Sequence, residues 1–290
     1  MNKIKILFPC SPFSNKEVDD NFQEEFKVTK TLGIDSFFYD HDLLANEKKV
    51  KVFGLKEDGL TILIRGWMMA IEQYEILYGF LKNNNQNLIT TPEQYKNCHY
   101  LRNSYQYIGK YSPKTLFTED FDQEILFKMF KEFPKGIILK DYVKSEKHIP
   151  GLFFIPPETT AEQLKNIIDR FIAARGKLFN IGVSFRDFIS LKHYDGEVNE
   201  WRVFVFKNKI VSVSQNSNIN PLANNFPKPP QKLIESISKE LKHLSQFFTI
   251  DFAEKESGEW IVVETGDGQV SGLSPKQNSI GLFNSIVSCL

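Results

Sequence analysis

Two acidic side chains near the C-terminus stand in a pattern that predicts a cation site. Asp251 and Glu264 lie in two β-rich runs that are separated by Ser257 and Gly258. Runs of this kind joined through a glycine-containing turn are typical of a β-hairpin. If Ser257 and Gly258 form the loop, counting outward along both strands places Asp251 directly opposite Glu264.

Facing carboxylates in a sheet repel each other, and apolar neighbours add a desolvation cost. A divalent cation removes both costs, because magnesium takes carboxylate oxygens and bridges to phosphates. The alternative is an edge hairpin whose acids point into solvent. Asp267, which stands between Gly266 and Gly268, adds a third acid directly after the strand. A Gly-Asp-Gly run also suits an ordinary turn, but three acids after an apolar strand favour the metal site.

Two basic residues in apolar strands need anionic partners. Lys140 lies in the apolar run 136–143, where an ammonium group is costly unless it meets an anion or reaches water. The polar segment 144–148 follows, and we expect either a phosphate-binding loop or a solvated surface loop. Strand alternation places Arg202 on one face with two phenylalanines, so its guanidinium needs a structural acid or a phosphate.

Other catalytic patterns are missing from the sequence. The histidines at positions 99, 148, 193 and 243 have no zinc-ligand spacing, and neither a Walker phosphate loop nor a GxGxxG run occurs. The segment 186–189 resembles a strand whose backbone could bind a purine edge, although by itself it carries almost no signal.

Strands and helices alternate in the first part of the chain, which predicts a small, mostly parallel sheet covered by helices. We expect strands at 3–9, 34–39 and 60–64 and helices at 16–32 and 70–82. Arg65 falls at the carboxyl end of a strand, where such sheets bind ligands. It is either a functional residue, able to hold an acceptor, or a salt-bridged surface arginine.

A boundary is expected in the Asn-rich stretch 83–91, which gives domains at 1–90 and 91–290. Beyond it we expect further strands, a hairpin over 200–215, a polar loop at 216–230 that is either a linker or a lid, and a helix over 231–248.

Composition narrows the class of protein. The 290 residues carry equal numbers of acidic and basic side chains, and zero net charge argues against a dedicated nucleic-acid binder. Cys10, Cys98 and Cys289 are odd in number and widely spaced, which indicates a reduced, cytoplasmic setting. No apolar stretch of about 18 residues predicts a membrane span.

Taken in order, these segments resemble the ATP-grasp superfamily. The resemblance is strongest to a divergent clade that includes the eukaryotic assembly chaperone of a translation initiation factor, together with bacterial and phage relatives. Residues 112–115, 200–205 and 209–215 are similar to that chaperone's signatures. The implied fold is α+β, with ATP between two α+β lobes and a Rossmann-like α/β domain preceding them.

The resemblance also implies roles for particular residues and the cofactors ATP and Mg²⁺. Phosphates would meet Lys140, with Lys144 in the covering loop and Lys114 a weaker candidate. Adenine would meet the segment beginning at Arg186, through backbone groups of Asp187 and Ile189. Arg202 would face the γ-phosphate, so Arg202 and Lys140 are the catalytic candidates. Asp251, Glu264 and Asp267 would bind magnesium.

Two departures from the family pattern stand out. The usual last metal ligand is an asparagine two residues after the glutamate, and Gly266 occupies that place. Asp267 would then have to substitute. The customary glycine-rich phosphate loop is replaced by residues 144–148.

We expect an ATP-dependent ligase that activates a carboxylate as an acyl phosphate for attack by an amine. The acceptor would be a small carboxylate, a peptide or a protein. The alternative is a non-catalytic, ATP-bound assembly protein. A third interpretation, phosphate transfer to a nucleic acid or a small alcohol, is disfavoured for nucleic acid by the neutral charge.

Overall fold

The computed structural model describes residues 4–56, 59–143, 145–146, 148–216, 218–224 and 226–290. Its first sheet has the strand order β4-β3-β1-β5-β6, with β2 paired to β1. Strands β1, β3, β5 and β6 run parallel, as the alternating pattern predicted, and β2 and β4 pair antiparallel. The strands of this sheet are β1 Ile4–Ser11, β2 Ser14–Val18, β3 Ser36–Tyr39, β4 Val52–Phe53, β5 Thr61–Ile64 and β6 Asn87–Leu88. Its helices are α1 Gln23–Thr31, α2 His41–Glu47 and α3 Ile71–Asn83.

The single helix expected over 16–32 is wrong. Residues Ser14–Val18 form β2, and a 3-10 turn at Asp20–Phe22 precedes α1. The Asp19 side chain accepts the backbone N–H of Asn21 at 2.9 Å. A capping side chain of this kind marks a helical start, so the chain before Asp19 pairs with β1 instead.

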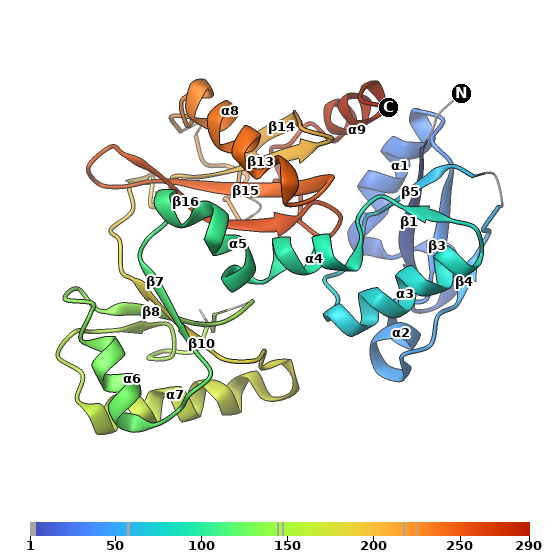
Figure 1. Cartoon of the computed structure of the whole chain (residues 1–290). Helices are drawn as coiled ribbons and strands as arrows, with labels where there is room; N and C mark the ends of the chain where they lie inside the picture. The colour runs from blue at the N-terminus through green and yellow to red at the C-terminus, as the bar shows by residue number, and fades with distance from the viewer. Residues whose placement is uncertain (1–3, 57–58, 144, 147, 217, 225) are drawn as a thin grey trace.

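The second sheet, with α6 and α7 on one face, forms the first lobe of the remaining chain (Figure 1). Its strand order is β7-β10-β8-β9, and all neighbours are antiparallel. Thr160 and Gln163 form a capping box that fixes the start of α7. The elements are β7 Thr115–Thr118, α6 Gln123–Phe130, β8 Ile137–Asp141, β9 Phe154–Ile155, α7 Ala161–Arg175, a 3-10 turn Gly176–Leu178 and β10 Val183–Asp187. The strand expected over 183–191 therefore ends early.

The third sheet, in the order β14-β13-β15-β16, forms the second lobe and is antiparallel throughout. One face packs beneath α8 in a core that contains Val203, Ile250 and Ile237. The helix expected over 231–248 is shorter, because the chain must turn back into β15. The elements are β11 His193–Tyr194, β12 Glu197–Val198, β13 Glu200–Phe206, β14 Lys209–Gln215, α8 Gln231–Glu240, a 3-10 turn Leu241–His243, β15 Phe247–Glu254 and β16 Trp260–Asp267.

Helices α4 Pro92–His99 and α5 Leu101–Ile108, followed by a 3-10 turn Gly109–Tyr111, connect the first sheet to the lobes. The C-terminal helix α9 Ser279–Ser288 contacts both α1 and β14. One apolar core therefore joins Phe8 of the first sheet to Phe204, Phe247 and Phe283 of the later chain. The domain boundary near residue 90 remains a prediction, and this core crosses it. Among the described residues, no helix combines the length and apolar character that crossing a membrane requires.

Phe247→Ala tests whether this shared core stabilises the whole chain. Phe247 is fully buried, and truncating a buried phenylalanine costs about 3–5 kcal/mol of unfolding free energy. We expect urea unfolding to shift to lower denaturant. Phe13→Ala is the control, because Phe13 is 97% exposed and its truncation should leave the midpoint unchanged. Equal midpoints for the two variants would contradict the prediction.

Candidate functional site

The hairpin of β15 and β16 places Asp251 directly opposite Glu264, as the sequence predicted. The counting that led there was incomplete. Glu254 pairs with Trp260, one residue away from the expected register, and the pairing shifts by one residue between Phe252 and Asp251. A β-bulge therefore restores the predicted pair, and bulges of this kind re-aim side chains next to functional sites.

Asp251 is held by the residue across from it on the neighbouring strand, Arg202 of β13. The guanidinium donates through Nε and Nη2 to the two carboxylate oxygens at 2.8 and 2.6 Å, and through Nη1 to the Gly272 carbonyl at 3.0 Å. Burial disfavours the charge on Arg202, but the carboxylate of Asp251 outweighs burial and raises the pKa of the guanidinium. In this state the anion that Arg202 required is a structural acid.

Glu264 is bound from the other lobe. Lys140 of β8 donates to its carboxylate at 3.0 Å, and the Lys140 side chain is 10% exposed. This contact crosses between the sheet of the first lobe and the sheet of the second lobe. Each of the two facing acids is thus neutralised by one base, which explains how the sheet tolerates them side by side.

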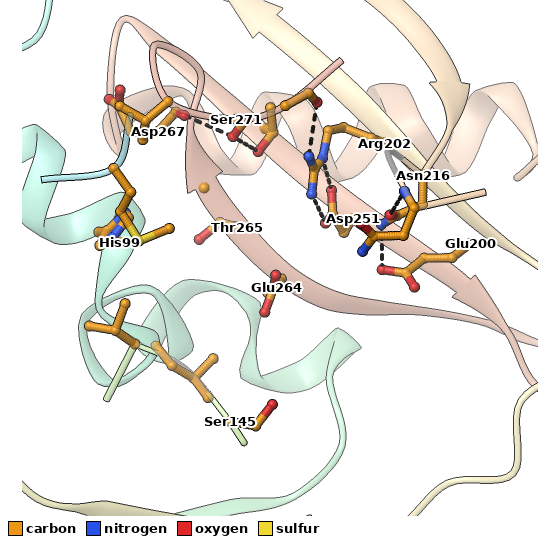
Figure 2. Close-up of a pocket in the computed structure, with 18 of the residues that line it drawn as sticks. His99, Ser145, Glu200, Arg202, Asn216, Asp251, Glu264, Thr265, Asp267 and Ser271 are labelled. Atoms are coloured by element: carbon orange, nitrogen blue, oxygen red, sulfur yellow. Dashed lines mark hydrogen bonds and ion pairs between the residues drawn. The ribbon is translucent and has the colours of Figure 1, made fainter. Parts of the chain in front are cut away.

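The four charged residues line a cavity of about 380 Å³ (Figure 2). Both lobes contribute to its wall, and Met68 reaches it from the first sheet's side of the chain. Ser145 and His148 place the expected covering loop at the cavity, while Lys144 lies outside the described residues. Further lining residues that sequence reasoning did not single out are His99, Glu200, Asn216, Thr249 and Ser271.

The described part of the 216–230 loop is attached to the body of the protein. Asn216 donates to the Glu200 carboxylate at 2.8 Å, and Ile219 and Phe226 are buried. Asn216 and Asn218 line the cavity. Of the two alternatives, the beginning of this loop is part of the cavity wall and not a bare linker.

Asp267 lines the cavity but points away from the expected metal position. It is three residues beyond Glu264 in β16, and side chains three apart in a strand lie on opposite faces. Its Oδ1 accepts the backbone N–H of Gln269 at 3.0 Å and the side-chain amide at 3.2 Å, and Figure 2 shows it apart from Asp251 and Glu264. Burial raises the pKa of Asp267 to about 7, against hydrogen bonds from Gln269 that lower it. We therefore remove Asp267 from the proposed ligand set.

The other nucleotide candidates lie outside the residues that line this cavity. The Lys114 ammonium pairs with Glu132 at 2.9 Å. Arg186 is buried and donates to the Val262 carbonyl at 3.3 Å, and burial lowers the pKa of its guanidinium to about 10. The Asp187 backbone N–H donates to the Lys114 carbonyl at 2.8 Å, so the carbonyl side of this segment, with Ile189, is what remains for an adenine.

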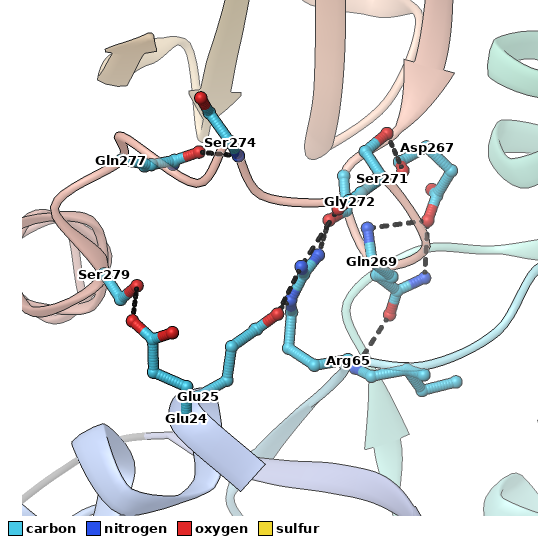
Figure 3. A network of polar contacts seen from close by, with 12 residues as sticks. Glu24, Glu25, Arg65, Asp267, Gln269, Ser271, Gly272, Ser274, Gln277 and Ser279 are labelled. Atoms are coloured by element: carbon cyan, nitrogen blue, oxygen red, sulfur yellow. Dashed lines mark hydrogen bonds and ion pairs between the residues drawn. The ribbon is translucent and has the colours of Figure 1, made fainter. Parts of the chain in front are cut away.

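Arg65 is a buried structural residue and not a surface one (Figure 3). It donates to both carboxylate oxygens of Glu25, at 2.6 and 2.9 Å, and to the carbonyls of Gly268 and Ser271. These contacts fix the loop that follows β16. The Arg65 guanidinium is thereby committed to the join between the first sheet and the site, and we no longer assign it to the acceptor.

The residues present fit a magnesium ion. Magnesium binds through one or two carboxylates together with substrate phosphates, and it does not need a complete protein cage. Asp251 and Glu264 supply two facing carboxylates at a cavity. In the described parts of the chain, no group of three or more histidine, cysteine and acidic residues is placed to hold a metal.

Asp267→Asn tests the burial of that carboxyl group through pH. Its folded pKa of about 7 lies above the ordinary value of 3.8, so the folded state keeps a proton that the unfolded state releases. The resulting stabilisation is complete below the ordinary pKa and is lost as pH rises through about 7. We expect the wild-type unfolding temperature to fall relative to that of Asp267→Asn between about pH 5 and pH 8. Parallel pH profiles would show that Asp267 is ionised throughout.

Comparisons with known proteins agree with this geometry. A family model that describes an ATP-grasp domain, the third family of its clade, matches residues 132–286, more than half of the 290 residues. No curated protein matches the chain. Macrocyclase MdnC from Microcystis aeruginosa MRC, bound with precursor peptide MdnA, superposes with a TM-score of 0.64 at 15% identity, covering 99% of this chain and 100% of that one.

Two further solved structures share the fold over nearly their whole length. D-alanyl-alanine synthetase A from Vibrio cholerae gives a TM-score of 0.59 at 12% identity and covers 99% and 98% of the two chains. ATP-grasp ligase PsnB, complexed with minimal precursor, Mg and ADP, gives 0.59 at 10% identity with 99% and 97% coverage. The chain therefore has the ATP-grasp fold, and it belongs to the ATP-grasp superfamily, in the third family of the matched clade.

Proposed function

We propose that this protein is an ATP- and magnesium-dependent ligase that joins a carboxylate to an amine. The observation that carries the proposal is the convergence of Asp251, Glu264, Lys140 and Arg202, from both lobes, on one cavity. Two acids that can hold a metal and two bases that can hold phosphates are the groups that phosphoryl transfer requires.

The proposed roles follow from the observed pairs. Asp251 and Glu264 would hold magnesium, which when bound supplies charge neutralisation at the phosphoryl oxygens. Arg202 presents a planar fork that matches a phosphate as well as a carboxylate, whereas Lys140 supplies a compact charge. As a cation takes over the two carboxylates, both bases can turn toward the phosphates. The pairs seen here keep the bases charged and in position until then.

The chain also supplies parts of the remaining contacts. Backbone carbonyls near Asp187 and Ile189 are the proposed adenine partners, and Lys144 remains proposed for the phosphates. Positioning and charge stabilisation supply most of the rate in phosphoryl transfer, which agrees with the lack of a histidine-based acid–base constellation in the sequence.

The acceptor we favour is a carboxylate on a peptide or protein. Among the structural relatives, MdnC is bound with a precursor peptide and PsnB is complexed with a minimal precursor, whereas D-alanyl-alanine synthetase is named for a small product. The second candidate function is a non-catalytic, ATP-bound assembly protein, which the resemblance to the initiation-factor chaperone favours.

Thermal unfolding with magnesium and ATP tests the nucleotide site. A ligand at a hundred times its Kd stabilises the native state by about 2.7 kcal/mol, so we expect a clear rise in wild-type Tm. Glu264→Gln, which keeps a hydrogen-bond acceptor for Lys140 and removes the charge, should lose most of the magnesium-dependent part. Glu259→Gln is the control, because Glu259 pairs with Lys255 on the exposed end of the same hairpin. Equal shifts in both variants would refute the assignment of Glu264.

Trapping with hydroxylamine separates the two candidate functions. A ligase that forms an acyl phosphate passes its acyl group to hydroxylamine, giving a hydroxamate and one ADP per turnover. We expect ATP- and magnesium-dependent hydroxamate with a member of a panel of small carboxylates and acidic peptides, and none with Arg202→Lys, which lacks the planar fork. Tight ATP binding without ADP release across the panel would favour the assembly protein.

A further inference from the structure

Gly266 leaves a space beside the metal position, and two hydroxyl groups fill that space. Gly266 of β16 pairs with Thr249 of β15, next to the pair of Asp251 and Glu264. A Cβ atom on Gly266 would lie 2.8 Å from Thr249 Oγ1 and 2.9 Å from Ser271 Oγ, closer than Cβ atoms come in real structures. The backbone of Gly266 is not in the left-handed region, so it is space and not conformation that excludes a side chain.

Thr249 shares the cavity-facing side of the sheet with the two acids. Residues two apart in a strand point to the same face, which places Thr249 beside Asp251 in β15 and Gly266 beside Glu264 in β16. Thr249 and Ser271 both line the cavity. The hydroxyl pair therefore occupies the part of the sheet from which the family's asparagine would reach a metal.

The hydrogen bonds orient the Thr249 oxygen. The Ser271 hydroxyl donates its proton to the Asp267 carbonyl at 2.8 Å. The 3.0 Å contact between Thr249 Oγ1 and Ser271 Oγ must then be donated by Thr249. With its proton committed to Ser271, the Thr249 oxygen keeps its lone pairs as acceptors, which is the form that ligates a hard cation.

We propose that the Thr249 hydroxyl, oriented by Ser271, is the third protein oxygen of the metal site in place of the asparagine of the family pattern. The proposal rests on the proposed function, because the site must first bind a magnesium nucleotide. A threonine or serine hydroxyl is a known ligand of Mg²⁺ in nucleotide-binding sites. Ser271 is a positioning residue that acts only through Thr249.

The test measures Mn²⁺ binding to the full chain by electron paramagnetic resonance in the presence of AMPPNP, without turnover. Thr249→Val keeps the shape and removes the oxygen, so we expect Mn²⁺ affinity to fall about tenfold. Thr249→Ser keeps the oxygen and should stay within about twofold of wild type. Binding of AMPPNP in EDTA should be the same in all three. Wild-type Mn²⁺ affinity in Thr249→Val would overturn the proposal.

A compensating variant provides a second, independent test. Gly266→Asn alone should weaken Mn²⁺ binding, because its Cβ meets both hydroxyls. In the Thr249→Ala, Ser271→Ala background the space opens, and Gly266→Asn should restore Mn²⁺ affinity toward wild type. Failure of the triple variant to exceed the double variant would overturn the inference. Failure of the wild type itself to bind Mn²⁺ with AMPPNP would instead refute the proposed function, so the two failures are distinguishable.

Discussion

Four charges of alternating sign hold the two lobes of this protein around one cavity. Arg202 forms a bidentate pair with Asp251 within the second lobe, and Lys140 reaches Glu264 from the first. Removing one partner of a buried pair leaves an uncompensated charge, which costs about 3–5 kcal/mol. The arrangement therefore stabilises the fold only while all four charges are present, and it keeps both bases beside the acids that a metal would claim.

The site depends equally on the first sheet. Arg65, paired with Glu25, holds the loop after β16 through the carbonyls of Gly268 and Ser271. That same loop presents the Gly272 carbonyl to Arg202 and the Ser271 hydroxyl to Thr249. A path of direct hydrogen bonds thus joins the N-terminal part of the chain to the cavity wall, and the shared core around Phe247 reinforces it. The first domain acts as part of the site's framework.

Much of the fold could be predicted from periodicity and turns, since those signals are local. The parallel strands of the first sheet, the β13–β14 hairpin and the pairing of Asp251 with Glu264 follow from such patterns. Two errors came from competing local signals. The Asp19 cap allowed Ser14–Val18 to pair as an edge strand, and the bulge in β16 changed the register that loop counting implied. Asp267 was misassigned although the two-residue strand period could have placed it on the far face.

The sequence by itself determined which chemistry is possible here. It contains the facing acids, a strand lysine, an arginine on an apolar face and a glycine where the family pattern has an asparagine, and side-chain type alone fixes what each can bind. Only the tertiary structure decided which groups meet. Lys140 and Glu264 are 124 residues apart in the chain, and Arg65 and Ser271 are 206 apart. Contacts at such separations depend on how the sheets pack, and no local pattern encodes that packing, so the Arg65 contacts and the Thr249–Ser271 hydroxyl pair emerged only from the folded chain.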